Sequence, residues 1–499
     1  MATQALPDGD SAGTFFGHPK GLFVLFFAEM WERFSYYGMR ALLIFYLVQH
    51  WLFSDSEASI IYGAYTALVY IAPVVGGYLA DRYLGQRKAV LFGAVLLTFG
   101  HFFMAFEGDG GQGSAIMNVF WLALALIIVG SGFLKANISV MVGQLYPRTD
   151  IRRDPAYTIF YMGINMGAAL GSLLCGYLGM HPDYGWSYGF GAAGVGMLLG
   201  LVVFIWGKPL LLGRGEPKDP AALKGGREIG IYAVGLAMVG LCWLAIQYQE
   251  LVGWVLAVFG LGLVTYVLWI AVAKLPAEER DRIFAAMFLI FVSIVFWALF
   301  EQAGNSLNLF TDRLVDRTMF GWSVPAPVFQ FLNAGYIVIF APIVAWMWVA
   351  LARRGREPAA PLKFAFGVFG VGLGFLALVA GMKAGGPTGL TAVYYIFLIY
   401  WIHTMAELML SPVGLSTVTK LAPARVVGLS MGAWFLYSGL SNYLAGVIAR
   451  STGAETIGGQ LTNVAAAKAT YAEVYTNVAY VAMAIAVVMV VISPLIKRM

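Results

Sequence analysis

Seven ionisable side chains lie inside long apolar stretches of the sequence: Glu29, Glu32, Arg33, Arg40, Lys135, Glu301 and Glu407. Each charge placed at the centre of a membrane-spanning helix costs about 3 kcal/mol on insertion scales. A domain's entire net stability is only about 5–15 kcal/mol, so these charges cannot all face lipid. They must line a hydrated cavity, pair with one another, or both, which makes them the first candidates for a functional site. For Arg40 the alternative is a side chain that extends to the lipid headgroups.

The spacing of the charges in the first half of the chain predicts a shared surface. Glu29 and Arg33 are four residues apart, and Tyr37 and Arg40 continue the same helix face. A later predicted helix adds Lys135. The first half therefore supplies the cations of the candidate cavity.

The second half supplies carboxylates. Glu301 and Glu407 lie on the seventh and tenth helices of a twelve-helix core, the counterparts of the helices that carry Arg33 and Lys135. A cavity between the two halves would be positive on one wall and negative on the other. Such a cavity suits a zwitterion whose charges are separated, such as a short peptide.

Uncharged polar and aromatic side chains in the middle of predicted helices are further candidates for ligand contact. They are Tyr36, Tyr37, Tyr70, Tyr161, Asn165, Trp297, Asn333 and Trp434. For each of them, packing inside the helix bundle is the alternative. Tyr161 and Asn165 are four residues apart, and a buried asparagine must find hydrogen-bond partners, which favours a role for this pair.

The composition requires a bilayer around the elements that carry these residues. Of 499 residues, 60% are hydrophobic and only 11% are charged, against about 45–50% and 25% in soluble domains. A spanning helix needs about 20 mostly apolar residues, and apolar runs of that length predict an all-α integral membrane protein with fourteen spans. The predicted spans are 21–50, 58–80, 87–106, 115–145, 156–178, 187–207, 228–248, 252–274, 283–311, 327–352, 363–382, 391–417, 426–449 and 471–496.

The distribution of cations predicts the topology of these spans. With a cytoplasmic N-terminus, 23 of the 31 Lys and Arg residues fall on one side of the membrane and 5 on the other. Cytoplasmic loops carry such an excess of cations, so we expect both termini in the cytoplasm. The predicted parts are a tail (1–20), a six-helix bundle (21–207), a cytoplasmic linker (208–227), an inserted helical hairpin (228–274) and a second six-helix bundle (283–496).

Several other classes of function find no support in the residues. The sequence contains no metal-ligand cluster, nucleophile triad or cofactor motif, so we expect neither an enzyme nor a cofactor, and nothing resembles a signalling domain of a receptor. The cations flank spans rather than forming a nucleic-acid surface, and we expect a monomer in the bilayer. Gly163, Gly167 and Gly171 form a repeated small-xxx-small pattern, which predicts close helix packing.

Four segments of the chain resemble signatures of the proton-coupled oligopeptide transporters, a branch of the major facilitator superfamily. The segment 76–88 (GGYLADRYLGQRK) resembles the superfamily's loop between its second and third helices, and 29–38 (EMWERFSYYG) matches the family motif ExxERFxYYG at every fixed position. The segments 160–171 and 406–415 resemble two further family signatures. The likeness covers nearly the whole chain, and the inserted hairpin resembles the extra helix pair of bacterial members.

The resemblance implies a major facilitator fold and proton-driven import of di- and tripeptides across a bacterial inner membrane. It would place Arg33, Tyr37, Tyr70 and Lys135 at the peptide carboxylate, Asn165, Asn333 and Glu407 at its amino end, and Trp297, Trp434 and Ser411 in side-chain pockets. The alternative within the same fold is transport of another small anion such as nitrate, as in plant relatives. An intact ExxER motif facing a carboxylate argues against that alternative.

Proton coupling and gating are the remaining expectations. Animal members carry a histidine on helix 2 where this chain has Gly63, so the proton site must be sought among Glu29, Glu32, Glu301 and Glu407, with Arg33 as their modulating cation. We also expect two salt bridges to close the extracellular side when the cavity opens inward. One pairs Arg40 with Glu301, and the other pairs Lys135 with Glu407.

Overall fold

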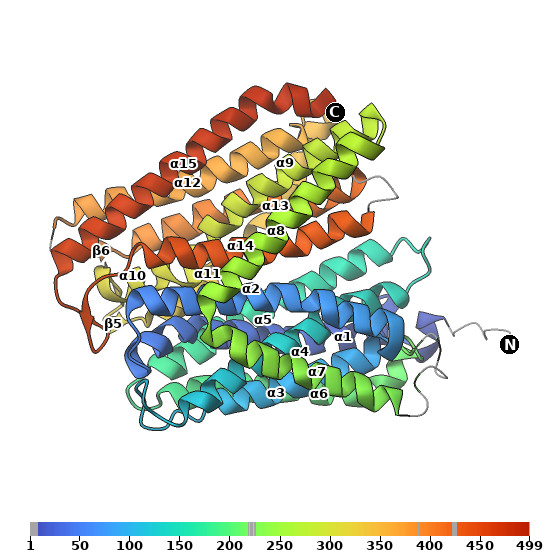
Figure 1. Cartoon of the computed structure of the whole chain (residues 1–499), viewed down its shortest axis with the longest axis horizontal. Coiled ribbons are helices and arrows are strands. Elements are labelled where there is room, and N and C mark those ends of the chain that lie inside the picture. Colours follow the sequence, from blue (N-terminus) through green and yellow to red (C-terminus); the bar gives the residue numbers. More distant parts are fainter. Residues whose placement is uncertain are drawn as a thin grey trace. The chain divides into compact units, whose positions relative to one another are not determined.

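The computed structural model describes residues 8–498, apart from 218, 220–222, 224–225, 388 and 422–426; at 412–421, 427–435 and 497–498 it describes the helix but not the side chains. Long helices make up most of this part of the chain (Figure 1). In chain order they are α1 (Lys20–Phe45), α2 (Asp55–Leu79), α3 (Gln86–Met104), α4 (Met117–Gln144), α5 (Arg153–Met180), α6 (Trp186–Trp206), α7 (Arg227–Gln247), α8 (Gln249–Lys274), α9 (Ala277–Phe300), α10 (Ser306–Leu314), α11 (Phe331–Arg353), α12 (Ala360–Ala384), α13 (Tyr394–Leu421), α14 (Val427–Arg450) and α15 (Val464–Arg498).

Every one of the fourteen predicted spans coincides with a helix of this list. Eleven helical stretches among the described residues meet the length and hydropathy needed to cross a membrane, and α1, α13 and α14 occupy the other predicted spans. The prediction at 283–311 differs in one respect, because two helices, α9 and α10, fill it with a short 3-10 turn at Glu301–Gly304 between them.

The strands of the described chain are two residues long and lie in the connections between helices. β1 (Thr14–Phe15) pairs with β2 (His18–Pro19), β4 (Thr318–Met319) with β5 (Trp322–Ser323), and β7 (Thr456–Ile457) with β8 (Gln460–Leu461), all antiparallel. β3 (Val315–Asp316) pairs in parallel with β6 (Thr391–Ala392).

The chain divides into two compact units. Unit 1 comprises residues up to 43 and 68–247, and unit 2 comprises 44–67 and 248–499. The predicted hairpin is shared, since α7 packs against α4 in unit 1 and α8 packs against α9 and α14 in unit 2. α2 is shared as well, and its interior Pro73 lies a few residues beyond the point of division. The five-part division at 20, 207, 227, 274 and 283 stays a prediction.

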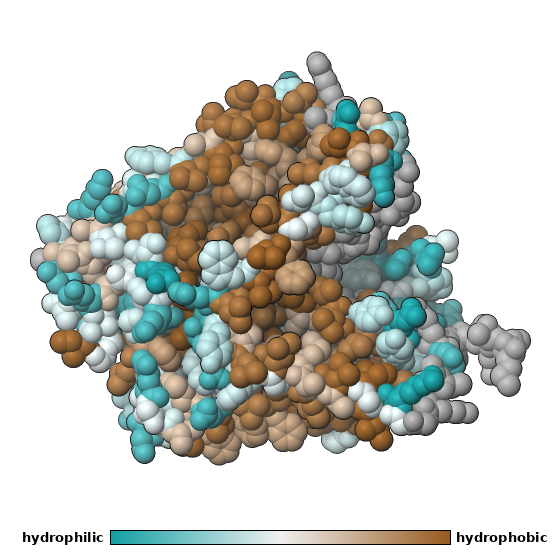
Figure 2. Space-filling view, in the orientation of Figure 1, coloured by the Kyte–Doolittle hydropathy of each residue, from teal (hydrophilic) through white to brown (hydrophobic). Residues whose placement is uncertain are grey.

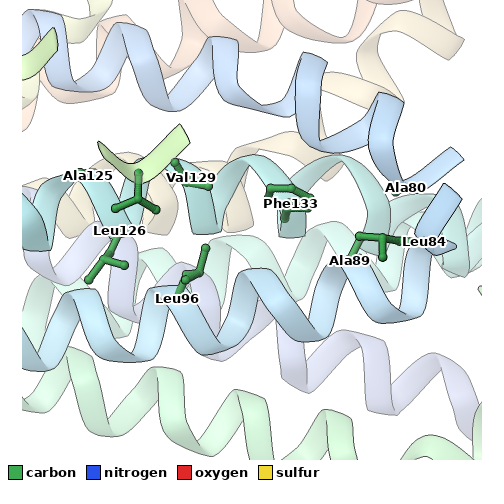
Figure 3. Close-up of a cluster of buried hydrophobic side chains, with 9 residues drawn as sticks. Ala80, Leu84, Ala89, Leu96, Ala125, Leu126, Val129 and Phe133 are labelled. Carbon is green, nitrogen blue, oxygen red and sulfur yellow. The ribbon is translucent and has the colours of Figure 1, made fainter. Parts of the chain in front are cut away.

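Apolar side chains of α3, α4 and α7 form a core in unit 1 (Figure 3). Leu96, Val129 and Phe133 are almost completely buried there. Glycines bring the helices close enough for this contact, since a Cβ built on Gly93 would lie only 2.6 Å from the carbonyl oxygen of Gly130. Close approach through small residues is typical of helices that pack in lipid.

The helices of the predicted hairpin carry large apolar side chains outward. Leu241 on α7 and Trp254, Phe259 and Leu261 on α8 are each more than half exposed. Figure 2 shows apolar side chains gathered over the middle of the helices, with hydrophilic ones towards their ends. A bilayer is the environment that such outward-facing apolar residues require.

Candidate functional site

The charged face predicted on α1 includes, in unit 1, a cluster of two buried carboxylates and one partly buried guanidinium. Arg33 Nη2 lies 2.6 Å from Glu29 Oε1, and Arg33 Nε lies 3.3 Å from Glu32 Oε2. The two carboxylates are 1% and 0% exposed, whereas the Arg33 side chain is 13% exposed. Among the described residues, Glu29 Oε2 and both Glu32 oxygens accept no hydrogen bond. One guanidinium thus serves two carboxylates, which leaves a buried negative charge that a proton can neutralise.

The second predicted cation of unit 1, Lys135 on α4, lies against aromatic rings. Its Nζ is 3.7 Å from the ring centroid of Tyr36 on α1 and 5.5 Å from that of Tyr70 on α2. An ammonium over aromatic faces is stabilised by the ring quadrupoles. Lys135 forms no ion pair with Glu29 or Glu32, so in unit 1 its charge is held by rings rather than neutralised by a carboxylate.

The remaining predicted residues of unit 1 lie on the same helices. Arg40 is buried at 6% exposure, with its Cζ 6.0 Å from the Tyr37 ring centroid, so it does not extend outward from the protein. On α5, Asn165 Nδ2 donates to the backbone carbonyl of Tyr161 at 3.0 Å. The Tyr161 ring is 47% exposed while Asn165 is buried. The buried asparagine has therefore found its partner in its own helix.

The predicted close packing at Gly163, Gly167 and Gly171 is confirmed, and it positions the charged cluster. A Cβ on Gly167 would lie 2.1 Å from the carbonyl oxygen of Met30 and 2.9 Å from Arg33 Cβ. Gly171 meets the backbone of Phe34 in the same way, and Gly163 meets the ring of Phe26. α5 therefore touches α1 backbone to backbone beside Arg33.

Replacing Gly167 by Ala should lower the stability of unit 1 by about 1–3 kcal/mol, the usual cost of overpacking. The added methyl group meets backbone on the α1 side, which cannot move away as a flexible side chain can. Thermal unfolding of the purified protein measures the effect. Gly191→Ala is the matched control, because a Cβ at that helical position of α6 meets nothing within 4 Å and should stabilise slightly through helix propensity. Equal melting temperatures for the two variants would contradict the packing argument.

In unit 2, Glu407 on α13 forms a polar cluster with the neighbouring helix α11. Asn333 Nδ2 donates to Glu407 Oε2 at 2.9 Å and to Thr404 Oγ1 at 3.1 Å. Glu407 is 9% exposed, and it forms no ion pair within the described part of unit 2. An amide supports this carboxylate, which keeps the negative charge available to a cationic group.

Glu301 lies where the seventh core helix is interrupted. The span predicted at 283–311 is confirmed within the helical stretch Ala277–Leu314, and the 3-10 turn Glu301–Gly304 inside it separates α9 from α10. Side chains replace the missing helix bonds: Gln302 Nε2 donates to the carbonyls of Ala298 and Ala445, and Asn305 exchanges two hydrogen bonds with Ser59. A helix can break in a membrane only where its backbone is satisfied in this way. The polar run from Glu301 to Ser306 is the sequence signal for the break.

Gly63 on α2 is a packing position. Its built Cβ would lie 2.8 Å from the Cα of Gly446 on α14 and 3.2 Å from the carbonyl oxygen of Asn442. Backbone meets backbone at this point, so no side chain fits. The same position therefore cannot carry an ionisable group unless α2 and α14 separate.

An ion pair that the sequence reasoning missed joins α2 to α10 within unit 2. Arg313 donates to both oxygens of Asp55, at 2.6 and 3.0 Å. The two side chains are 4% and 1% exposed, and the backbone N–H of Ala454 adds a third donor to Asp55 at 3.3 Å. The sequence alone does not single out Asp55, because it opens α2, where an acidic residue is usual.

The last three predicted residues contribute less to the described geometry. Trp297 is half-buried and lies 5.2 Å, centroid to centroid, from both Phe296 and Phe300. Ser411 is exposed, and the Trp434 side chain lies outside the described residues. Each predicted gating pair has one member in unit 1 and one in unit 2, so both pairs stay predictions.

These helices and clusters define a multi-span α-helical membrane transporter, and comparison with known proteins gives its family. The model of the POT family matches residues 87–464. The sequence is 38% identical over 436 residues to the uncharacterized transporter YclF of Bacillus subtilis, covering 85% of this chain and 86% of that protein. It is 35% identical to the peptide transporter YePEPT of Yersinia enterocolitica, covering 87% and 88%. The dipeptide and tripeptide permease B of Aeromonas hydrophila is 32% identical, with coverage of 96% and 94%.

Comparison with solved structures gives the same family. A peptide transporter POT in complex with sulfate superposes with a TM-score of 0.84 at 36% identity, covering 97% of this chain and 96% of the other. A POT family transporter in complex with 5-aminolevulinic acid has a TM-score of 0.82 at 31% identity, with coverage of 97% and 98%. The chain belongs to the POT family and has the major facilitator fold of its transporters.

Proposed function

We propose that this chain is a symporter that uses the proton gradient to import di- and tripeptides by alternating access. The observation that carries the proposal is the contrast between the two units. Unit 1 holds Arg33 and Lys135 in its interior, and unit 2 holds Glu407 without an ion-pair partner in its described part. A zwitterion requires cationic side chains for its carboxylate and an anionic side chain for its ammonium group. The names of YePEPT and of permease B agree with this substrate class.

The carboxylate end of the peptide would bind to the cations of unit 1. Arg33 is the more exposed member of its cluster, and Lys135 has rings rather than a carboxylate beside it, so both can accept an anion. Tyr37 and Tyr70 would complete this end. At the amino end, Glu407 would receive the ammonium group, with Asn333 holding the carboxylate in place and Asn165 as a further contact. A nitrate transporter would not require a carboxylate such as Glu407, because nitrate has no cationic group for it to bind.

The proton would be carried by the α1 cluster. When a peptide carboxylate engages Arg33, the hold of this guanidinium on Glu29 and Glu32 weakens, and one of the buried carboxylates must then take up a proton. Binding of proton and peptide would be reciprocally linked, so that each raises the affinity for the other. Glu301 and Glu407 are the alternative carriers.

The transporter would lie in the inner membrane of a bacterium with both termini in the cytoplasm, as a monomer. In this orientation the Asp55 end of α2 is extracellular. The Asp55–Arg313 pair would then join the expected Arg40–Glu301 and Lys135–Glu407 pairs as a latch that holds when the cavity is open to the cytoplasm. Pro73 weakens the helix just beyond Ala67, which gives α2 a place to bend when the latch opens.

Uptake of a labelled dipeptide into proteoliposomes tests the function. We expect accumulation above the external concentration only with an inwardly directed proton gradient, and inhibition by other di- and tripeptides but not by nitrate. Uptake that ignores the pH gradient would contradict symport, and competition by nitrate would favour the alternative.

Replacing Glu407 by Gln should weaken transport of free-amine peptides about ten- to a hundredfold, the worth of one charge-assisted contact of about 1.5–3 kcal/mol. N-acetylated peptides carry no ammonium group and should lose much less. Competition curves with a dipeptide and its N-acetylated form measure the difference. Glu278→Gln, on an exposed residue of the first turn of α9, is the control. Equal loss for both peptides would show that Glu407 does not bind the amino end.

A further inference from the structure

A cavity of about 710 Å³ opens at the end of unit 1 that carries the N-terminal segment, outside the candidate transport site. It lies where α3 begins, α4 ends and α5 begins, which is the level of the membrane surface. The residues that matter for its chemistry are Arg148, Arg153, Arg214, Tyr146 and Tyr157. Three guanidinium groups and two phenols around one space are typical of a site for a multiply charged oxyanion.

The walls of this cavity are held in place by hydrogen bonds between the chain after α6 and the helices α3 and α4. The backbone N–H of Arg87 donates to the Gly215 carbonyl at 2.9 Å, and the Gly215 N–H donates to Gln144 Oε1 at 2.9 Å. Gln144 Nε2 in turn donates to Gln86 Oε1 at 3.3 Å. This segment brings Arg214 to the cavity and closes one side of it.

The acidic groups around the cavity are already engaged. Glu216, the carboxylate in its wall, pairs with Arg87 through Oε1 and Oε2. On the other side of the α4–α5 loop, Arg152 pairs with Asp150 and Asp10, and its hydrogen bonds hold the pKa of Asp150 below the usual value. These carboxylates therefore do not neutralise Arg148 and Arg153, two of the cations that face the cavity.

Arg148 and Arg153 remain for a ligand. Arg148 is exposed, and neither residue forms an ion pair with a described carboxylate. Arg153 Nε is buried without an acceptor. A Cβ on Gly143 would lie 2.5 Å from Tyr157 Oη and 3.1 Å from Arg153 Nη2, so these two donors meet over the bare backbone of α4.

We propose that this cavity binds a phosphate group, presented either by an anionic phospholipid headgroup or by a soluble phosphate compound. The site goes beyond the proposed transport function and uses none of its residues. A phosphate offers several oxygens to forked guanidinium donors at once. A basic pocket at the ends of spanning helices is the usual form of a headgroup site.

Thermal unfolding with added ligand tests the proposal on the full-length protein, because a ligand that binds the folded state raises the melting temperature with its concentration. One arm titrates inorganic phosphate in detergent. The other compares nanodiscs of phosphatidylglycerol with nanodiscs of phosphatidylcholine. Stabilisation by free phosphate identifies a soluble compound as the ligand, and stabilisation only by phosphatidylglycerol identifies the headgroup. Either result supports the site, and no stabilisation in either arm overturns it.

Two variants locate the binding. Arg148→Gln removes an exposed cation, so the protein should fold, and it should weaken binding about ten- to a hundredfold. Gly143→Val fills the cavity beside Arg153 and Tyr157 without changing any charge, and it should abolish most of the stabilisation. Arg354→Gln removes an exposed cation of unit 2 as the matched control and should bind as the wild type does. Equal binding by Arg148→Gln and Arg354→Gln would overturn the proposal.

Discussion

Replacing Glu32 by Gln should abolish proton-driven accumulation of peptide, bringing the internal to external ratio to about one, while exchange of peptide across the membrane continues. Both oxygens of Glu32 are buried and accept no hydrogen bond from the described residues. When Arg33 contacts the carboxylate of a peptide, Glu32 is therefore the carboxylate of the cluster whose negative charge is least compensated. Without a group that takes up the proton, the proton gradient cannot drive the accumulation of peptide.

Exchange should survive because the binding geometry does not depend on Glu32. Arg33 keeps its closer partner Glu29, which Nη2 and Nε approach to 2.6 and 2.7 Å. Counterflow of labelled dipeptide in preloaded proteoliposomes, without a pH gradient, measures this step. Glu29→Gln is the contrasting variant: it removes the closer partner of Arg33, as protonation would, so it should free this guanidinium for the peptide carboxylate and raise peptide affinity. If the Glu32 variant still accumulates peptide against its gradient, the α1 cluster is not the coupling site.

Replacing Arg313 by Gln should destabilise the inward-open state by about 3–5 kcal/mol, the cost of leaving one partner of a buried ion pair without the other. Asp55 would keep a hydrogen bond from Ala454 but no cation. The end of α2 before Ala67 should then separate more readily from α10. Thermal unfolding reports the loss of stability. Thiol labelling of a cysteine at Ala58, a fully buried position of α2, reports the separation.

The double variant Asp55→Asn, Arg313→Gln is the control for this argument. It removes both charges together and should recover most of the lost stability, because no bare charge remains buried. Labelling at position 58 should stay fast, since the latch is still absent. If Arg313→Gln alone leaves both melting and labelling unchanged, the pair is not a latch.

The extent to which the sequence predicts this protein depends on the range of the interactions involved. The spans follow from apolar runs of fixed length, because lipid imposes one requirement on every helix separately. The contact of Arg33 with Glu29 follows from helical spacing. The close approach of α5 to α1 follows from three glycines four residues apart, since small residues permit one kind of contact.

Contacts between distant segments needed the tertiary structure. Arg313 and Asp55 are 258 residues apart, and nothing in either local sequence indicates the other. The break after Phe300 depends on Gln302 finding the carbonyl of Ala445, and on Asn305 finding Ser59. The chain after α6 reads as a polar linker, yet Gly215 is fixed between Arg87 and Gln144 and closes a basic cavity.

The sequence by itself determined the class, the spans and the charged residues that a bilayer does not tolerate without a function. Those properties come from one-dimensional constraints, namely hydropathy, charge and helical period. Only the tertiary structure decided which charge meets which partner. In that structure Arg33 contacts two carboxylates, Lys135 lies against aromatic rings, and Glu407 accepts a hydrogen bond from Asn333. The reason is physical: the free energy of a buried charge depends on its nearest neighbours within a few ångströms, and the chain path alone selects them.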